Sequence, residues 1–198
     1  MPGTEKQTPA PEVKKNMELT KSLYGKLNIE SHWYALATRN RHEKKVAERL
    51  QQKGITHYLP LITAIRYWSD RKKKVTEPLF SCYAFVKIAL RERMSVLQTD
   101  GAVKLVTFNN VPVPIPDYQI HSIRQAIETS QSIQRLDHWQ IGQHVEVISG
   151  PLKGVRGILQ KKKGRTKLAI AVDGINQAIE VEIGADEVKE IESQVLAK

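Results

Sequence analysis

Residues 79–88 read LFSCYAFVKI, an almost unbroken apolar run that contains one charge. The run is far shorter than the roughly 20 residues that a helix needs to cross a bilayer, and it is rich in aromatic residues. We therefore predict a central strand of a sheet. Because successive side chains of a strand point to opposite faces, Tyr83 and Phe85 should share one face. The smaller Cys82, Ala84 and Val86 should share the other face and pack against helices.

Patterns on both sides of this run predict the rest of an α+β unit. A strand is expected at 33–38. The next helix should begin after the N-cap Asn40, with Glu43 completing the capping pattern, and run to about Lys53, where Gly54 ends it. The other predicted elements are a hairpin with a basic tip formed by 57–61, 65–68 and 73–77, a short helix at 91–99, a strand at 103–108, a turn at Asn109-Asn110, and a helix capped by Asp117. Strands and helices in this order should share one core.

The hydrophobic period changes to two in the last third of the chain. Val145 and Val147 alternate with polar residues, and the same alternation returns in the segments 168–172 and 179–183. We predict a small all-β barrel of about five short strands, because closure removes exposed sheet edges. The polar stretch 131–140 is then a linker, and residues 1–30, with three prolines and little apolar periodicity, are predicted to form a flexible tail.

The net charge of the 198-residue chain is +10, and most of the excess lies in one segment. Residues 32–130 carry 16 basic and 8 acidic side chains, whereas the basic and acidic counts nearly balance elsewhere. Such a segment favours a polyanionic partner, most often nucleic acid, although a solvated lysine-rich surface is the alternative. The candidate nucleic-acid contacts are Arg39, Arg41, Lys44 and Lys45 at the start of the first helix and Arg71, Lys72, Lys73 and Lys74 at the hairpin tip.

The sequence lacks the motifs of several common kinds of catalytic and ligand-binding site. Phosphate-binding loops, dinucleotide fingerprints, zinc-protease motifs and nucleophile elbows are missing, and the six histidines lack ligand spacing. Cys82 is the only cysteine, and its place in the apolar run favours a small buried residue over a nucleophile. We expect a protein that is not an enzyme, with no metal site and no cofactor, in the reducing cytoplasm and away from membranes. An enzyme acting on nucleic acid is the weaker hypothesis.

Two motifs resemble one known family. The run Trp33-Tyr34-Ala35-Leu36, the helix from Glu43, the turn that begins Trp68-Ser69-Asp70, and the residues 77–86 resemble the N-terminal domain of the NusG transcription elongation factors. The later segment VEVISGPLKGVRGI, residues 145–158, resembles a KOW motif. The resemblance covers about residues 32–192.

The NusG resemblance implies a fold and a partner. It implies an N-terminal NGN domain at 31–130, an antiparallel sheet flanked by helices, and after the linker an SH3-like KOW barrel at 141–192, with 193–198 as a C-terminal tail. It also implies that the NGN domain binds the clamp helices of RNA polymerase and bridges the DNA cleft. The family's polymerase-facing aromatics fall on Phe80, Tyr83 and Phe85. Ser81-Cys82 departs from the family's usual Pro-Gly or Pro-Asn, which puts the local bend of the strand in question.

The function implied by the resemblance is transcription elongation and antitermination. The tail, the basic hairpin and the altered strand motif are more similar to specialised RfaH-like and UpxY-like paralogues, which act on long operons such as those for surface polysaccharides. The KOW domain is then expected to recruit a second partner, which is a ribosomal protein, a termination factor or RNA. Its KOW loop residues are Gly150, Lys153, Gly154, Arg156 and Gly157. Two alternatives remain: a ribosome-associated or general RNA-binding KOW protein, and a strand whose aromatic face is covered internally, for instance by the C-terminal domain.

Overall fold

The computed structural model describes residues 25–67, 72–130, 133–136, 142–162, 165–175 and 177–191. The described part is an α+β protein with one mixed helix and sheet region and a further all-β region. Most of the predicted tail, residues 1–24, lies outside the described residues. Residues 25–29 are helical, and Leu27 is buried, so this end of the predicted flexible tail is part of the folded structure.

The first sheet is antiparallel and centred on the predicted strand. Its order is β2 (His57–Tyr58), β5 (Tyr83–Ile88), β1 (His32–Thr38) and β6 (Ala102–Leu105), and β9 (Pro114–Ile115) also pairs with β1. The β1–β5 register places Tyr34 opposite Val86 and Ala35 opposite Phe85. The prediction of a central strand is therefore confirmed.

One face of the first sheet packs against two helices. Helix α2 (Glu43–Gln52) supplies Val46 and Leu50, and helix α3 (Arg93–Leu97), which follows the 3-10 turn η1 (Leu90–Glu92), supplies Val96. These side chains enclose Tyr34 and Val86 in one buried cluster. The pattern is the one that the alternation along the strand predicted for the smaller side chains.

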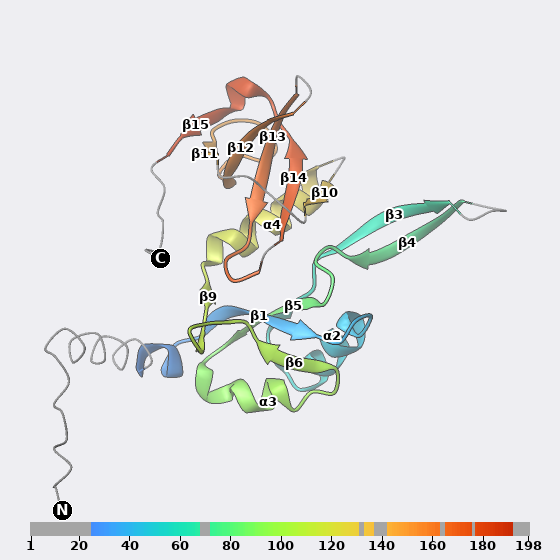
Figure 1. Cartoon of the computed structure of the whole chain (residues 1–198), viewed down its shortest axis with the longest axis vertical. Helices are drawn as coiled ribbons and strands as arrows, with labels where there is room; N and C mark the ends of the chain where they lie inside the picture. Colours follow the sequence, from blue (N-terminus) through green and yellow to red (C-terminus); the bar gives the residue numbers. More distant parts are fainter. Residues whose placement is uncertain are drawn as a thin grey trace, which may run out of the picture.

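The opposite face of the sheet belongs to a second cluster that extends into the all-β region. Helix α4 (Asp117–Thr129) contributes its buried Ile120, Ile123 and Ala126, which join Trp33 and Phe85 of the sheet. The same cluster continues through Ile170 and other core residues of the second sheet. Helix α4 thus lies between the two sheets (Figure 1).

Two hairpins extend from the first region. Strands β3 (Leu61–Tyr67) and β4 (Lys72–Pro78) form a two-stranded ribbon that projects away from the rest of the molecule (Figure 1). Strands β7 (Thr107–Phe108) and β8 (Val111–Pro112) are joined by Asn109 and Asn110 with φ of 48° and 64°, which confirms the predicted turn.

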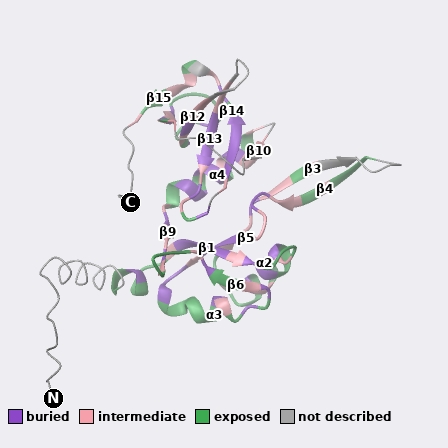
Figure 2. Ribbon diagram, viewed as in Figure 1, coloured by how far each residue is buried: buried purple, intermediate pink, exposed green. Residues whose placement is uncertain are grey.

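The second sheet is antiparallel and has six strands. They follow the order β10 (Ile133–Leu136), β14 (Ala178–Glu182), β13 (Arg165–Ala171), β12 (Arg156–Lys162), β11 (Gln143–Val147) and β15 (Val188–Glu190), the last preceded by the 3-10 turn η2 (Ala185–Glu187). Leu168 of β13 and Ile179 of β14 are fully buried, and much of these two strands is buried (Figure 2). Part of the predicted linker is strand β10, which pairs with β14, so residues 133–136 are not free chain. The division of the chain into domains stays a prediction.

Three local predictions are wrong. Asn40 does not cap α2, because the N-cap is His42 and the buried Glu43 instead accepts the backbone N–H of Cys82 at 2.7 Å. Asp117 is the first residue of α4 and follows the N-cap Pro116. Cys82 is half-buried in a turn ahead of β5, with φ of 65°. The strand therefore begins four residues later than its apolar run.

Candidate partner-binding site

The three predicted polymerase-facing aromatics lie together on the side of the first sheet that faces α4. Phe80 and Phe85 are fully buried, with ring centroids 5.7 Å apart in an edge-to-face arrangement. Tyr58 of β2 stacks on Phe85 at 6.3 Å, and the half-buried Tyr83 packs against the same cluster. The structure brings the aromatics together, and Tyr83 alone of the three is partly exposed.

A tight turn places these aromatics. Cys82 donates its N–H to Glu43 and accepts the N–H of Thr38 at 2.8 Å, which fixes the turn against α2 and β1. The N–H of Tyr83 reaches the carbonyl of Phe80 at 3.4 Å. The left-handed backbone of Cys82 is the conformation that glycine adopts without steric cost, so the bend survives although the sequence has no Pro-Gly here.

Cationic side chains cover this aromatic face. The Arg124 guanidinium of α4 lies 4.6 Å from the ring centroid of Tyr58 and 5.8 Å from that of Trp33. Lys87 of β5 lies 5.9 Å from the Trp33 ring and pairs with Asp117 at 3.0 Å. These contacts hold one side of α4 on the first sheet.

Burial of the Tyr58 hydroxyl changes its acidity. Loss of water around it raises the pKa of Tyr58 to about 12, while the positive charge of Arg124 acts in the opposite direction and Glu128 adds to the increase. At neutral pH the hydroxyl is therefore protonated and uncharged.

The other side of α4 contacts the second sheet through main-chain groups. Gln125 donates its amide to the carbonyls of Pro151 and Lys153, both at 3.0 Å, and Gln119 accepts the N–H of Asp173 at 2.9 Å. The Arg156 guanidinium lies 5.6 Å from the ring centroid of an α4 residue, Tyr118. The predicted KOW loop is therefore one of the parts of the second sheet region that pack against α4, together with strand β13 and the turn at Asp173.

The glycines of that loop shape its backbone. Gly150 and Gly154 have φ of 76° and 86°, and a Cβ on Gly157 would lie 2.5 Å from the carbonyl oxygen of Ala169. These three predicted site residues shape the loop, which leaves Lys153 and Arg156 to make side-chain contacts. Arg156 pairs with Glu146 at 2.8 Å.

The two basic clusters adjoin each other at one point. Lys44 of α2 donates to the carbonyl of Thr76 in β4 at 2.8 Å, which ties the start of the helix to the ribbon. Arg39 contacts Asp100 at 3.4 Å. The exposed residues of the two clusters are Arg39, Arg41, Lys44, Lys45, Lys72, Lys73 and Lys74, and Arg71 lies outside the described residues.

Sequence reasoning missed Trp33, Tyr58 and Arg124 as parts of one site. Trp33 could have been found from the alternation along β1. It lies two residues before Ala35, so both point to the same face, and Ala35 is paired with Phe85 of β5 on that face. Nothing local connects Arg124 to Tyr58, since the two residues are far apart in the sequence. Within the described ranges, no group of three or more His, Cys, Asp or Glu side chains is placed to hold a metal ion, and no helix is long and apolar enough to span a membrane.

Comparison with known proteins identifies the first region. The sequence profile of the NusG family, described as transcription termination factor nusG, matches residues 31–124. A structure of Thermotoga maritima NusG, titled for its domain interaction, is 21% identical with a TM-score of 0.48, and the match covers 83% of this chain and 99% of that chain. The MjSpt4:Spt5 complex gives 17% identity and a TM-score of 0.28 over 82% of this chain and 99% of the other. Residues 31–124 are the segment that forms the first sheet with its helices, and this segment is a domain of the NusG family of transcription factors.

Proposed function

We propose that this protein is a transcription elongation and antitermination factor that binds RNA polymerase through the aromatic face of its NusG-family domain. The observation that carries the proposal is the coincidence of two features on one sheet. The family match covers 31–124, and within it Phe80, Tyr83 and Phe85 gather on the face that α4 covers. Aromatic anchors of this kind typically dominate a protein interface.

The buried state of that face adds a condition to the proposal. Phe80 and Phe85 have no exposed surface, so a partner helix gains contact with them only when α4 moves away. Helix α4 is held there by its buried Ile120, Ile123 and Ala126, and also by Arg124 and the Lys87–Asp117 pair, whose polar contacts are individually worth about 1 kcal/mol or less at exposed sites. Binding of polymerase should therefore compete with the contacts of α4.

The basic clusters support a second contact, with nucleic acid of the elongation complex. Lys72, Lys73 and Lys74 are exposed on the projecting ribbon, where they can meet phosphates without reading sequence. In the proposed role the protein suppresses pausing or termination on long operons, such as those for surface polysaccharides, as its RfaH-like and UpxY-like resemblance implies. The second sheet region would recruit a ribosomal protein or a termination factor.

The test is a binding assay of the full chain against purified bacterial core RNA polymerase at two salt concentrations. Tyr83→Ala removes the half-buried aromatic of the face, and Phe108→Ala removes an aromatic of the β7–β8 hairpin that is 64% exposed. We expect Tyr83→Ala to weaken binding about tenfold or more and Phe108→Ala to leave it unchanged. Thermal unfolding of both variants confirms that each is folded.

Other outcomes decide against the proposal. A folded Tyr83→Ala protein that binds polymerase as tightly as the unsubstituted chain would exclude this face. Salt-dependent RNA binding by the full chain, without any polymerase complex, would favour the alternative of a ribosome-associated or general RNA-binding protein. A termination-readthrough assay on a long template then separates antitermination from simple polymerase binding.

A further inference from the structure

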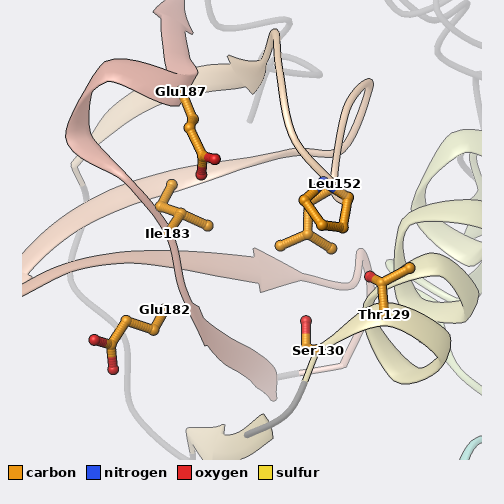
Figure 3. A pocket seen from close by; sticks show the side chains of 7 residues that line it. Thr129, Ser130, Leu152, Glu182, Ile183 and Glu187 are labelled. Carbon is orange, nitrogen blue, oxygen red and sulfur yellow. The ribbon is translucent and has the colours of Figure 1, made fainter.

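A cavity of about 390 Å³ lies where the end of α4 meets the second sheet (Figure 3), and no residue of the aromatic face or of the two basic clusters lines it. Its walls come from three places in the chain: the last turn of α4, the loop after β11, and the segment from the end of β14 to η2. The lining residues are Thr129, Ser130, Pro151, Leu152, Glu182, Ile183 and Glu187.

The charge of this cavity is opposite to that of the whole chain. The lining contains two glutamates and no lysine, arginine or histidine, although the net charge of the protein is +10. Figure 3 shows the Glu187 carboxylate directed toward the space between Ile183 and Leu152, whereas the Glu182 carboxylate points away from it. Glu187 is therefore the acid that a bound group would meet.

The Glu187 carboxylate is held in place by its surroundings. Its Oε2 accepts the N–H of Gly184 at 2.9 Å, and the backbone carbonyl of Glu187 accepts the N–H of Ile148 at 2.8 Å. A Cβ on Gly150 would lie 2.7 Å from Glu187 Oε1, so the glycine leaves room for that oxygen. A carboxylate fixed in this way loses little side-chain freedom when it pairs with a cation.

A second, independent feature of the cavity is an unused hydroxyl. The Oγ of Ser130 is buried and makes no hydrogen bond among the described residues. A buried hydroxyl without a partner is costly. Because this oxygen has almost no exposed surface, a donor group of a ligand would supply the missing bond only if the cavity wall yields slightly. Ser130 also follows the last turn of α4, where the helix dipole presents partial negative charge. Both features favour a cationic hydrogen-bond donor.

We propose that this cavity binds an alkylguanidinium group. The guanidinium would pair with Glu187 and donate to Ser130 Oγ, and its methylene chain would pack between Leu152 and Ile183, which are 7% and 9% exposed. A planar group with several fixed N–H donors suits an acid and a hydroxyl placed on different walls. The source is either a free small molecule or an arginine side chain of another polypeptide.

Isothermal titration of the full chain with n-butylguanidinium tests the proposal, with neutral n-butylurea as the matched probe. We expect saturable binding of the guanidinium and none of the urea. Glu187→Gln should weaken binding about tenfold or more, whereas Glu190→Gln, an exposed acid of β15, should not change it. A titration with N-acetylarginine amide identifies the source of the guanidinium. If this compound binds more tightly than n-butylguanidinium, the source is an arginine side chain of a polypeptide. If it binds more weakly, the source is a free small molecule.

A second variant keeps the test decisive if Glu187→Gln does not fold. Thr129 is exposed at the rim, so Thr129→Arg places a tethered guanidinium beside the cavity and should abolish binding of the free probe while Glu187 stays intact. The absence of saturable n-butylguanidinium binding by the unsubstituted chain would overturn the proposal. Equal affinity in the unsubstituted, Glu187→Gln and Thr129→Arg proteins would place the bound group elsewhere and overturn it as well.

Discussion

The two faces of the first sheet are covered in different ways. Against α2 and α3 the contacts are almost wholly aliphatic, with Leu36, Val46 and Leu50 at 0% exposure. Against α4 the same sheet presents Trp33 and aromatic neighbours, and the cover includes cations that lie over their rings. Separating apolar side chains exposes their surface to water, so the full free energy of their burial is lost. A cation that moves away from an aromatic ring is hydrated again, which offsets part of the cost.

The difference indicates which face defines the fold and which face can open. Helices α2 and α3 each use one apolar side and bury it on this sheet. Helix α4 divides its contacts between two sheets, and its polar contacts with the second sheet go largely to main-chain groups through Gln119 and Gln125. An element with two sets of moderate contacts can give up one set while the rest of the fold remains.

The largest effect should come from the aliphatic face. Leu50→Ala should lower the free energy of unfolding by about 2–5 kcal/mol, because a fully buried leucine leaves a cavity. Ile127→Ala, a half-buried residue of α4, should cost clearly less. Urea denaturation of both variants measures the two losses, and equal losses would remove the distinction between the faces.

High pH should lower the free energy of unfolding through a tyrosine on each face of the first sheet, and by less than Leu50→Ala does. Burial raises the pKa of Tyr34 and of Tyr58 to about 12, from the ordinary 10.0. Between these values the unfolded chain releases protons that the folded chain keeps, so the free energy of unfolding falls as pH rises from 10 toward 12. Tyr34→Phe and Tyr58→Phe should each reduce that fall in denaturation curves recorded across this range. A pH dependence that neither substitution changes would assign the effect to other groups.

Removal of one cation should loosen α4 alone. Arg124→Ala loses the contacts with Tyr58 and Trp33, worth about 0.5–1 kcal/mol at an exposed site. We expect faster amide exchange in α4, unchanged exchange in α2, and, under the proposed function, tighter polymerase binding because the aromatic face opens more readily. Arg91→Ala, an exposed arginine of η1, is the control. Unchanged exchange in α4 would show that Arg124 does not hold the helix.

The sequence could predict those parts of the fold that depend on short-range periodicity. The alternation along β5 placed Tyr83 and Phe85 on one face and Val86 on the other, as the two buried clusters confirm. The left-handed turns at Gly54 and at Asn109-Asn110 follow from residue types that tolerate positive φ. Each of these features is decided by neighbours within a few residues.

Features that depend on distant partners could not be predicted. Glu43 accepts a hydrogen bond from Cys82, which lies 39 residues later, so the motif that resembled a helix cap has another role. Strand β10 lies in a largely polar stretch without a clear period, and its pairing with β14 exists only in the folded sheet. The contacts of Gln125 go to main-chain carbonyls, which every residue carries and no sequence pattern reveals.

The smallest predicted effect concerns the turn that leads into the aromatic face. Cys82 adopts a φ of 65°, which costs a non-glycine residue about 1–2 kcal/mol, whereas glycine gives up roughly 0.5–1 kcal/mol through the entropy of the unfolded chain. The first quantity is larger, so Cys82→Gly should raise the free energy of unfolding by about 0.5 kcal/mol. Cys82→Ala keeps the left-handed strain and loses only the thiol, so it should give no increase, and Ala84→Gly in β5 should be destabilising. Urea denaturation of the three variants separates the effect of backbone strain from the effect of losing the side chain. If glycine and alanine at position 82 give the same free energy of unfolding, the turn is unstrained. The hydrogen bonds that Cys82 makes with Glu43 and Thr38 then hold, by themselves, the bend that presents Phe80 and Tyr83.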